Sequence, residues 1–195
     1  MPNKITLDNK PFNLTDSFLP CIITWADKSW ASFFSICLIS NLIQQWFKTI
    51  FFTAFPMAKE KLLKQIWNEK FYEINKKSDL NNLPSDKSII VKSWNQKLFL
   101  QTIQNIKNLD EYIIFIKNIE EYDESVLDWI PESQKIILSW NLDNCRFEDI
   151  IINKKLESKI IFTVPKNSDI KIPKLEKYES YLISKKISGI LRLEE

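Results

Sequence analysis

Residues 25–32, with the sequence WADKSWAS, are the segment whose residue types and spacing come nearest to a chemical site. They follow a run of β-forming residues, Cys21 to Thr24, and precede the apolar segment 31–43. This pattern predicts a loop that connects a buried strand to a helix. Backbone N–H groups in such a loop, together with the N-terminus of the helix, can hold a phosphate or another anion. Loops of this kind are normally rich in glycine, whereas this one contains two tryptophans.

Glycine and tryptophan are unusually distributed along the whole chain. There is a single glycine, Gly189, and there are seven tryptophans, whereas an average glycine content of about 7% would give roughly fourteen glycines. Every tryptophan is predicted to lie at a position typical of glycine, near the end of a strand or helix or in a turn, and none in the middle of a strand. The seven residues are Trp25, Trp30, Trp46, Trp67, Trp94, Trp129 and Trp140.

We hypothesise that these tryptophans stand for glycine. Some bacterial lineages read the codon UGA as glycine, and a commonly used alternative table reads it as tryptophan. Thirty isoleucines against three valines, and 25 lysines against two arginines, indicate a very AT-rich gene. The alternative is that an AT-rich gene is simply poor in glycine and that its tryptophans are genuine. That alternative explains the shortage of glycine but not the positions of the tryptophans.

With glycine at positions 25 and 30, the loop fits the phosphate-binding frame G-x-x-x-x-G-K-[ST] except at one position. Ala31 stands where the frame has its lysine, and Ser32 supplies the hydroxyl that would ligate Mg²⁺. Lys28 is a candidate substitute for the lysine, with an ordinary solvent-exposed loop lysine as the alternative. The predicted nucleotide-binding residues are Trp25, Ala26, Asp27, Lys28, Ser29, Trp30, Ala31 and Ser32. If the tryptophans are genuine, two indoles would keep phosphates away and the site would be closed.

The segments around this loop alternate between strand and helix. Strands are predicted at 20–24, 48–54, 87–93, 111–119, 134–139 and 158–165. Helices are predicted at 30–45, 56–66, 95–107, 122–129 and 146–156, with a terminal hairpin at 180–195. Strands made almost entirely of isoleucine and phenylalanine are typical of a mostly parallel sheet that is covered on both faces. We therefore expect one α/β layered domain over residues 1–195, with residues 1–19 as an N-terminal extension.

Two further segments support a resemblance to a known group of proteins. The sequence KTIFFTAFPMAKEKLLKQI at 48–66 resembles the second strand and helix of the RecA-like P-loop NTPases, within them the KaiC-like and RadA-like group. The sequence LDEYIIFIKNIEEY at 109–122 resembles their Walker B region. The resemblance implies a RecA-like fold that ends in a hairpin. It also implies either ATP or ADP with Mg²⁺ as a ligand, or no cofactor at all.

The chain departs from that group at both charged positions of the site. The Walker B acid should end the strand, where this chain has Lys117 followed by Asn118. Glu120 and Glu121 lie slightly downstream and are candidates to reach a metal, with a solvated start of a helix as the alternative. Phosphoryl transfer depends on positioning and on charge neutralisation by lysine and Mg²⁺. With Ala31 and Lys117 at these positions, we expect at most a weak ATPase.

Two classes of function therefore stay open. The first is a degenerate nucleotide-binding protein with little or no hydrolysis, acting as a switch, as a homo-oligomer or as one subunit beside a RecA-like partner. The second is a non-catalytic scaffold or interaction module on the same fold, without a nucleotide. A nucleic-acid binder is disfavoured because the net charge is only +2 and no basic stripe is evident. A metal hydrolase is disfavoured because acidic residues such as those in 120–125 lack a histidine beside them.

The remaining composition excludes some kinds of catalytic and metal site and indicates the cellular compartment. The chain has no histidine, so a Cys–His zinc site and histidine-based acid–base catalysis are excluded. Cys21 and Cys37 are expected to be buried core thiols, and three widely spaced cysteines suit a reducing compartment. The N-terminus has no apolar signal segment, and the longest apolar run, 31–43, is too short to span a bilayer. We expect a cytoplasmic protein without membrane contact.

Overall fold

The structure is a computed structural model. It describes residues 4–13, 18–25, 31–53, 71–92, 95–119, 122, 124–131, 134–141, 173–176, 179–184 and 187–194. The strands are β1 (Lys4–Leu7), β2 (Lys10–Pro11), β3 (Cys21–Trp25), β4 (Lys48–Thr53), β5 (Phe71–Ile74), β6 (Ser88–Lys92), β7 (Tyr112–Ile116), β8 (Lys135–Asn141), β9 (Glu179–Ser184) and β10 (Ser188–Glu194). The helices are α1 (Ala31–Gln44) and α3 (Gln96–Asn105), with 3₁₀ helices η2 (Lys77–Asn82), η3 (Leu109–Glu111) and η5 (Glu124–Trp129).

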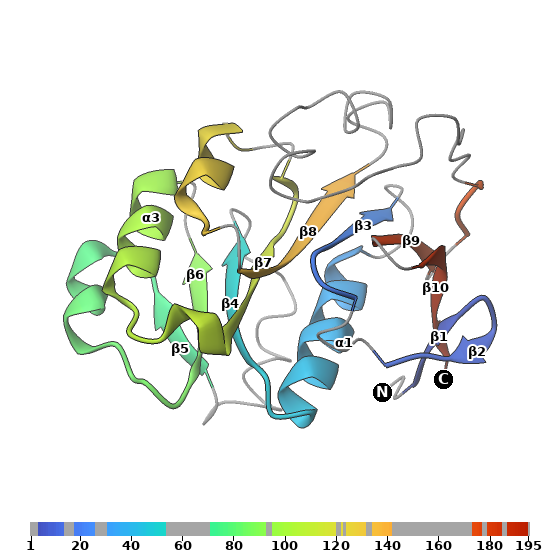
Figure 1. Cartoon of the computed structure of the whole chain (residues 1–195), viewed down its shortest axis with the longest axis horizontal. Helices are drawn as coiled ribbons and strands as arrows, with labels where there is room; N and C mark the ends of the chain where they lie inside the picture. The colour runs from blue at the N-terminus through green and yellow to red at the C-terminus, as the bar shows by residue number, and fades with distance from the viewer. Residues whose placement is uncertain are drawn as a thin grey trace.

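The strands form one mixed sheet of ten, in the order β2-β1-β10-β9-β3-β8-β7-β4-β6-β5. The six strands from β3 to β5 in this order run parallel to one another, and the four from β9 to β2 continue the sheet in antiparallel fashion. Figure 1 shows β4, β6 and β8 pointing the same way, with the antiparallel strands on the right. The carboxyl ends of the parallel strands therefore meet at one edge, which is where ligands bind in open α/β sheets.

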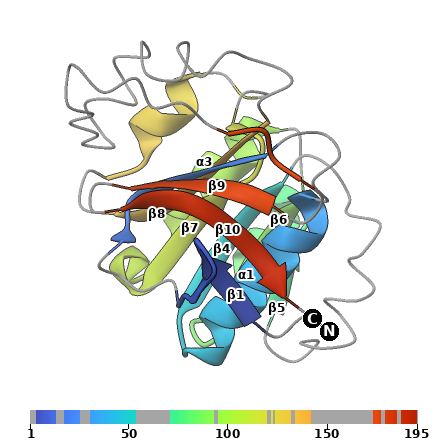
Figure 2. The same ribbon diagram turned by 90° about the vertical axis from the view of Figure 1, so that its right-hand side faces the viewer.

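Both faces of the sheet are buried, because successive side chains of a strand point to opposite sides. In β7, Ile113 and Phe115 belong to the core cluster on the face of α1, which also contains Leu38, Ile39 and Leu42 of that helix. The alternate residues of β7, Tyr112, Ile114 and Ile116, pack on the other face with Leu98, Phe99 and Ile103 of α3. Figures 1 and 2 show α1 and α3 on opposite sides of the sheet. This arrangement confirms an α/β domain with a mostly parallel sheet flanked by helices.

The N-terminal strands are joined to the C-terminal hairpin. β1 pairs with β10, so that Lys4 lies opposite Glu194, and Figure 2 shows β1, β9 and β10 close together. Asp8 in the β1–β2 turn accepts a hydrogen bond from the N–H of Ile190 at 2.9 Å. A Cβ on Gly189 would lie 2.4 Å from Oδ2 of Asp8, so a larger residue there would require the Asp8 carboxylate to move. Part of the segment predicted as an extension is thus integrated into the sheet.

The predicted elements agree with the structure wherever it describes them. The strands predicted at 20–24, 48–54, 87–93, 111–119 and 134–139, the helices at 30–45 and 95–107 and the hairpin are all confirmed. The short helix predicted at 122–129 is a 3₁₀ helix over Glu124–Trp129. The strands β1, β2 and β5 were not predicted. The helices predicted at 56–66 and 146–156 and the strand at 158–165 lie outside the described residues. Within the described residues, no helix combines the length and the apolar character needed to cross a membrane.

Candidate functional site

The predicted phosphate loop lies between two well-defined elements. Strand β3 ends at Trp25, and α1 begins at Ala31. Ala31 and Ser32 are therefore the first two residues of a 14-residue helix, at the edge where the parallel strands end. The first turn of α1 contains no acidic residue, so its partial positive charge is not neutralised by its own side chains. Residues 26–30, which include Asp27 and Lys28, lie outside the described residues.

The side chain of Trp25 belongs to the core rather than to the loop. Trp25 is 2% exposed and packs in the cluster that α1 forms with the sheet, together with Leu38 and Ile39. Its backbone is strand, in register with Asn141 of β8. The sequence-based placement of this residue at a glycine-like loop position is thus corrected. The Trp25 indole is accommodated by burial between the sheet and the helix.

Trp46 has the opposite environment. It is 88% exposed and adopts the left-handed conformation, with φ of 69°. Its N–H donates to the carbonyl oxygen of Ile43, and the N–H of Phe47 donates to that of Leu42, both at 3.0 Å. This pair of hydrogen bonds is the Schellman motif, in which the left-handed position is usually glycine. The prediction of a glycine-type position is confirmed at this residue.

Two of the other tryptophans, Trp129 and Trp140, lie within the described residues. Trp140 is the next-to-last residue of β8, whereas the sequence predicted it to follow the strand. Trp129 is the last residue of η5 and packs, half-buried, against the core on the α3 side. Trp30, Trp67 and Trp94 lie outside the described residues. Backbone conformation and burial therefore distinguish two of the tryptophans. Trp46 lies at a position typical of glycine, and Trp25 is a core residue.

The edge next to the loop carries a buried lysine. Lys117 directly follows β7 and is 5% exposed. Its N–H donates to the carbonyl oxygen of Phe52 in β4 at 3.0 Å. Asn118 then turns the chain with φ of 54°, and its N–H donates to Oγ of Ser139 in β8 at 2.8 Å. Ser139 in turn lies opposite Ile23 of β3, so this turn sits one strand away from the strand that leads into the loop.

Within the described residues, the carboxyl ends of the parallel strands β3, β8, β7 and β4 offer no carboxylate to a divalent cation. Mg²⁺ is normally held by one or two carboxylates together with substrate phosphates. The four strands β3, β8, β7 and β4 contain neither Asp nor Glu, and the position expected to carry an acid is Lys117. Glu120 and Glu121, the sequence-based candidates, lie outside the described residues. Among the residues that the structure does describe, no group of three or more potential ligands is placed to hold a metal.

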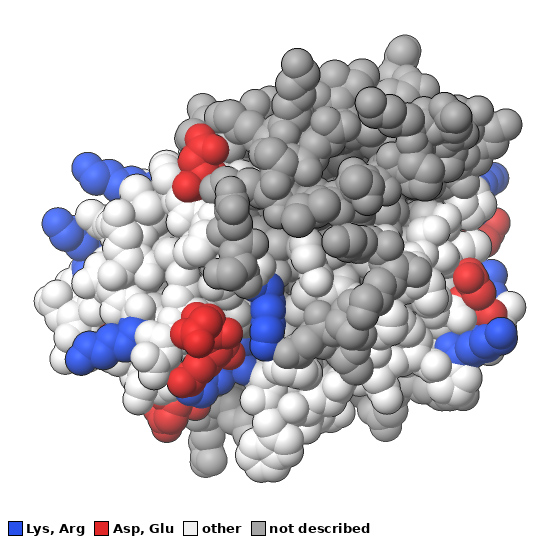
Figure 3. Space-filling view, viewed as in Figure 1, with Lys and Arg blue, Asp and Glu red and all other residues white. Residues whose placement is uncertain are grey.

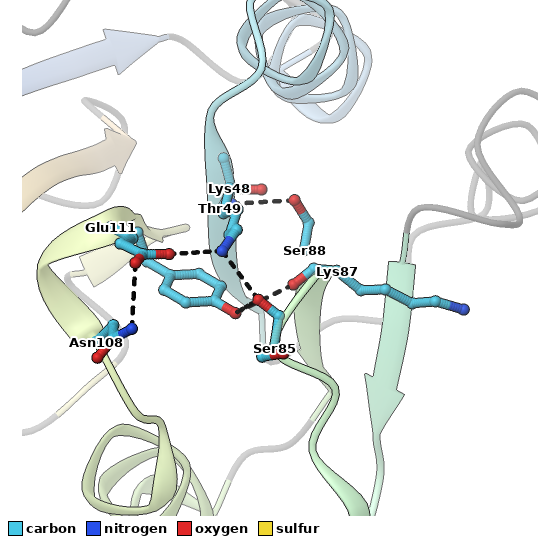
Figure 4. A network of polar contacts seen from close by, with 8 residues as sticks. Lys48, Thr49, Ser85, Lys87, Ser88, Asn108 and Glu111 are labelled. Carbon is cyan, nitrogen blue, oxygen red and sulfur yellow. Dashed lines mark hydrogen bonds and ion pairs between the residues drawn. The ribbon is translucent and has the colours of Figure 1, made fainter.

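A second polar cluster occupies the opposite edge of the sheet. Nζ of Lys48 lies 2.6 Å from Oε2 of Glu111 and donates to the carbonyl oxygen of Ser85 at 2.9 Å (Figure 4). The hydroxyl of Tyr112 donates to the carbonyl oxygen of Lys87 at 3.4 Å. These contacts attach the segment before β6 to the first residues of β4 and β7. Because they lie at the amino ends of the parallel strands, this cluster is structural and separate from the candidate site.

The charged groups in this cluster shift one another's pKa values. The hydrogen bond from Lys48 holds the pKa of the Glu111 carboxyl below its ordinary value. The same contact raises the pKa of Lys48. Burial raises the pKa of the Tyr112 hydroxyl, and the positive charge of Lys48 opposes that shift. The largest causes of these pKa shifts are the Lys48–Glu111 contact and the burial of the Tyr112 ring.

Two of the three cysteines, Cys21 and Cys37, lie within the described residues. Cys21 is fully buried, and burial strongly raises the pKa of its thiol, so the reactive thiolate is suppressed. Cys37 is half-buried in α1 rather than fully buried as predicted. On the face drawn in Figure 3, blue and red side chains lie interspersed over the described atoms, without a patch of one sign.

Comparison with known proteins gives a likeness in fold. No protein-family model matches the chain, and no curated protein matches it in sequence. The genome packaging NTPase B204 of Sulfolobus turreted icosahedral virus 2, solved in complex with sulfate, superimposes with a TM-score of 0.52 and 12% identity, over 89% of this chain and 96% of the viral protein. The T. fusca Cas3 structure with AMPPNP gives 0.48 and 9% identity, over 90% of this chain and 25% of Cas3. The likeness to the B204 NTPase shows that the chain has an α/β fold of the kind found in that protein.

Proposed function

We propose that this protein binds the phosphate groups of a nucleotide, ATP or ADP, with little or no hydrolysis. The proposal depends on one arrangement, in which buried strand β3 leads within residues 26–30 into the N-terminus of α1 at the carboxyl edge of the parallel strands. Free backbone N–H groups and the helix dipole favour an anion at such a position. The absence of an acid from the first turn of α1 leaves that preference intact.

Slow or absent hydrolysis follows from the charged residues of the site. The first position of α1 is Ala31 instead of the lysine that would contact the β- and γ-phosphates. The position of the metal-binding acid is Lys117. Phosphoryl transfer without these groups loses most of its charge neutralisation. A protein that binds a nucleotide without hydrolysing it would act through the binding itself. It would serve as a switch, or as one subunit of an assembly of RecA-like proteins.

Direct binding measurements test this function. The full chain is dialysed against labelled ATP or ADP, and against sulfate, the anion present in the B204 structure. Ser32→Glu places a negative charge in the first turn of α1 and is expected to abolish binding. Gln44→Glu adds the same charge at the other end of the helix and is expected to leave binding intact. Equal binding by both variants, or no binding by the unaltered chain, would contradict the proposal.

The second candidate function is a scaffold without a nucleotide, and the burial of Trp25 favours it. An indole at the end of β3 is 2% exposed, so core packing holds the residue at which the loop starts. A scaffold would form a stable homo-oligomer, or a complex with a RecA-like partner, that nucleotides do not change. Sedimentation of the chain with and without ATP separates the two functions.

We further propose that the native cell inserts glycine at the seven tryptophan positions. Trp46 supports this proposal. Its position at the end of α1 is left-handed and exposed, and helices commonly have glycine at such a position. Trp25 supports the alternative that the tryptophans are genuine, because its side chain is part of the core. Mass spectrometry of peptides that span positions 25, 30, 46 and 140, from protein purified from its native host, decides the question. Glycine would restore the phosphate-binding loop except for its lysine, and tryptophan would favour the scaffold.

A further inference from the structure

We draw no further inference here: the strongest candidate, the exposed surface that Trp46 forms next to Phe47 just after the C-terminal end of α1, carries none, because nothing in the structure shows what covers it.

Discussion

The backbone N–H of Trp46 lies 3.0 Å from the carbonyl oxygen of Ile43, and this hydrogen bond holds the tryptophan in the left-handed conformation at the end of α1. A left-handed residue with a Cβ costs roughly 1–2 kcal/mol compared with the right-handed form. Burial does not compensate here, because the indole is 88% exposed. The end of α1 therefore carries a local conflict between its backbone and its side chain.

Trp46→Gly is expected to stabilise the protein by about 0.5–1 kcal/mol. Glycine removes the strain of the positive φ, although its freedom in the unfolded chain offsets part of the gain. Urea unfolding followed by far-ultraviolet circular dichroism measures the change in the free energy of unfolding. Trp46→Ala is the control, since it removes the indole but keeps the Cβ, and it should leave stability nearly unchanged. A loss of stability in the glycine variant would show that the indole makes a contact worth more than the strain.

Trp25→Gly is expected to have the opposite effect, with a loss of about 3–5 kcal/mol. The indole fills the space between β3 and α1 beside Leu38, and its removal leaves a cavity as well as lost transfer free energy. The same urea experiment measures this loss, and Trp25→Phe, which retains an aromatic ring, should lose less. A neutral result for Trp25→Gly would mean that the core closes over the gap, which would favour glycine as the natural residue at this position.

The sequence was sufficient to predict the buried parallel strands, because Phe51, Ile114 and their neighbours form apolar runs that only a sheet covered on both faces can bury. It was not sufficient for β5, whose residues Phe71, Tyr72 and Glu73 are only half-buried at the end of the sheet and mix apolar with charged side chains. β1 was missed for another reason. Lys4–Leu7 pairs with β10 at the far end of the chain, and such long-range pairing leaves no local signal.

The candidate site was predictable in part. The loop was located from the change of pattern between Thr24 and Ala31, and that change depends only on local sequence. The environment of Trp25 was not predictable, since a tryptophan at the end of a strand fits a turn or a core equally well. Burial of Lys117 was also missed. Lysine is almost never fully buried unless it is paired, so the sequence alone favoured solvent, and only the neighbouring strands β4 and β8 show otherwise.

Glu111→Gln is expected to make the stability of the protein less dependent on pH in acid. The folded-state pKa of Glu111 is lowered below its ordinary value of 4.5 by Lys48. Its contribution is therefore present above pH 4.5 and is lost as the pH falls through the lowered value. The difference in unfolding free energy between the unaltered chain and the variant, measured from pH 7 downwards, should shrink below pH 4.5. Asp110→Asn is the control on the neighbouring carboxylate, and a difference that persists into strong acid would contradict the assignment.

Ser139→Ala is expected to weaken both the fold and the site. Oγ of Ser139 is fully buried and accepts the N–H of Asn118 at 2.8 Å. Because Asn118 is only half-buried, loss of this hydrogen bond is expected to cost about 1 kcal/mol. The same hydrogen bond positions the turn after Lys117, and the proposed affinity for ATP should fall with its loss. Ser180→Ala is the matched control, because Ser180 is equally buried in β9 while its Oγ forms no hydrogen bond within the described part of the chain. Urea unfolding should show Ser180→Ala within about 0.5 kcal/mol of the unaltered protein. Equal losses in the two variants would mean that the Asn118–Ser139 contact neither stabilises the turn nor orients the lysine.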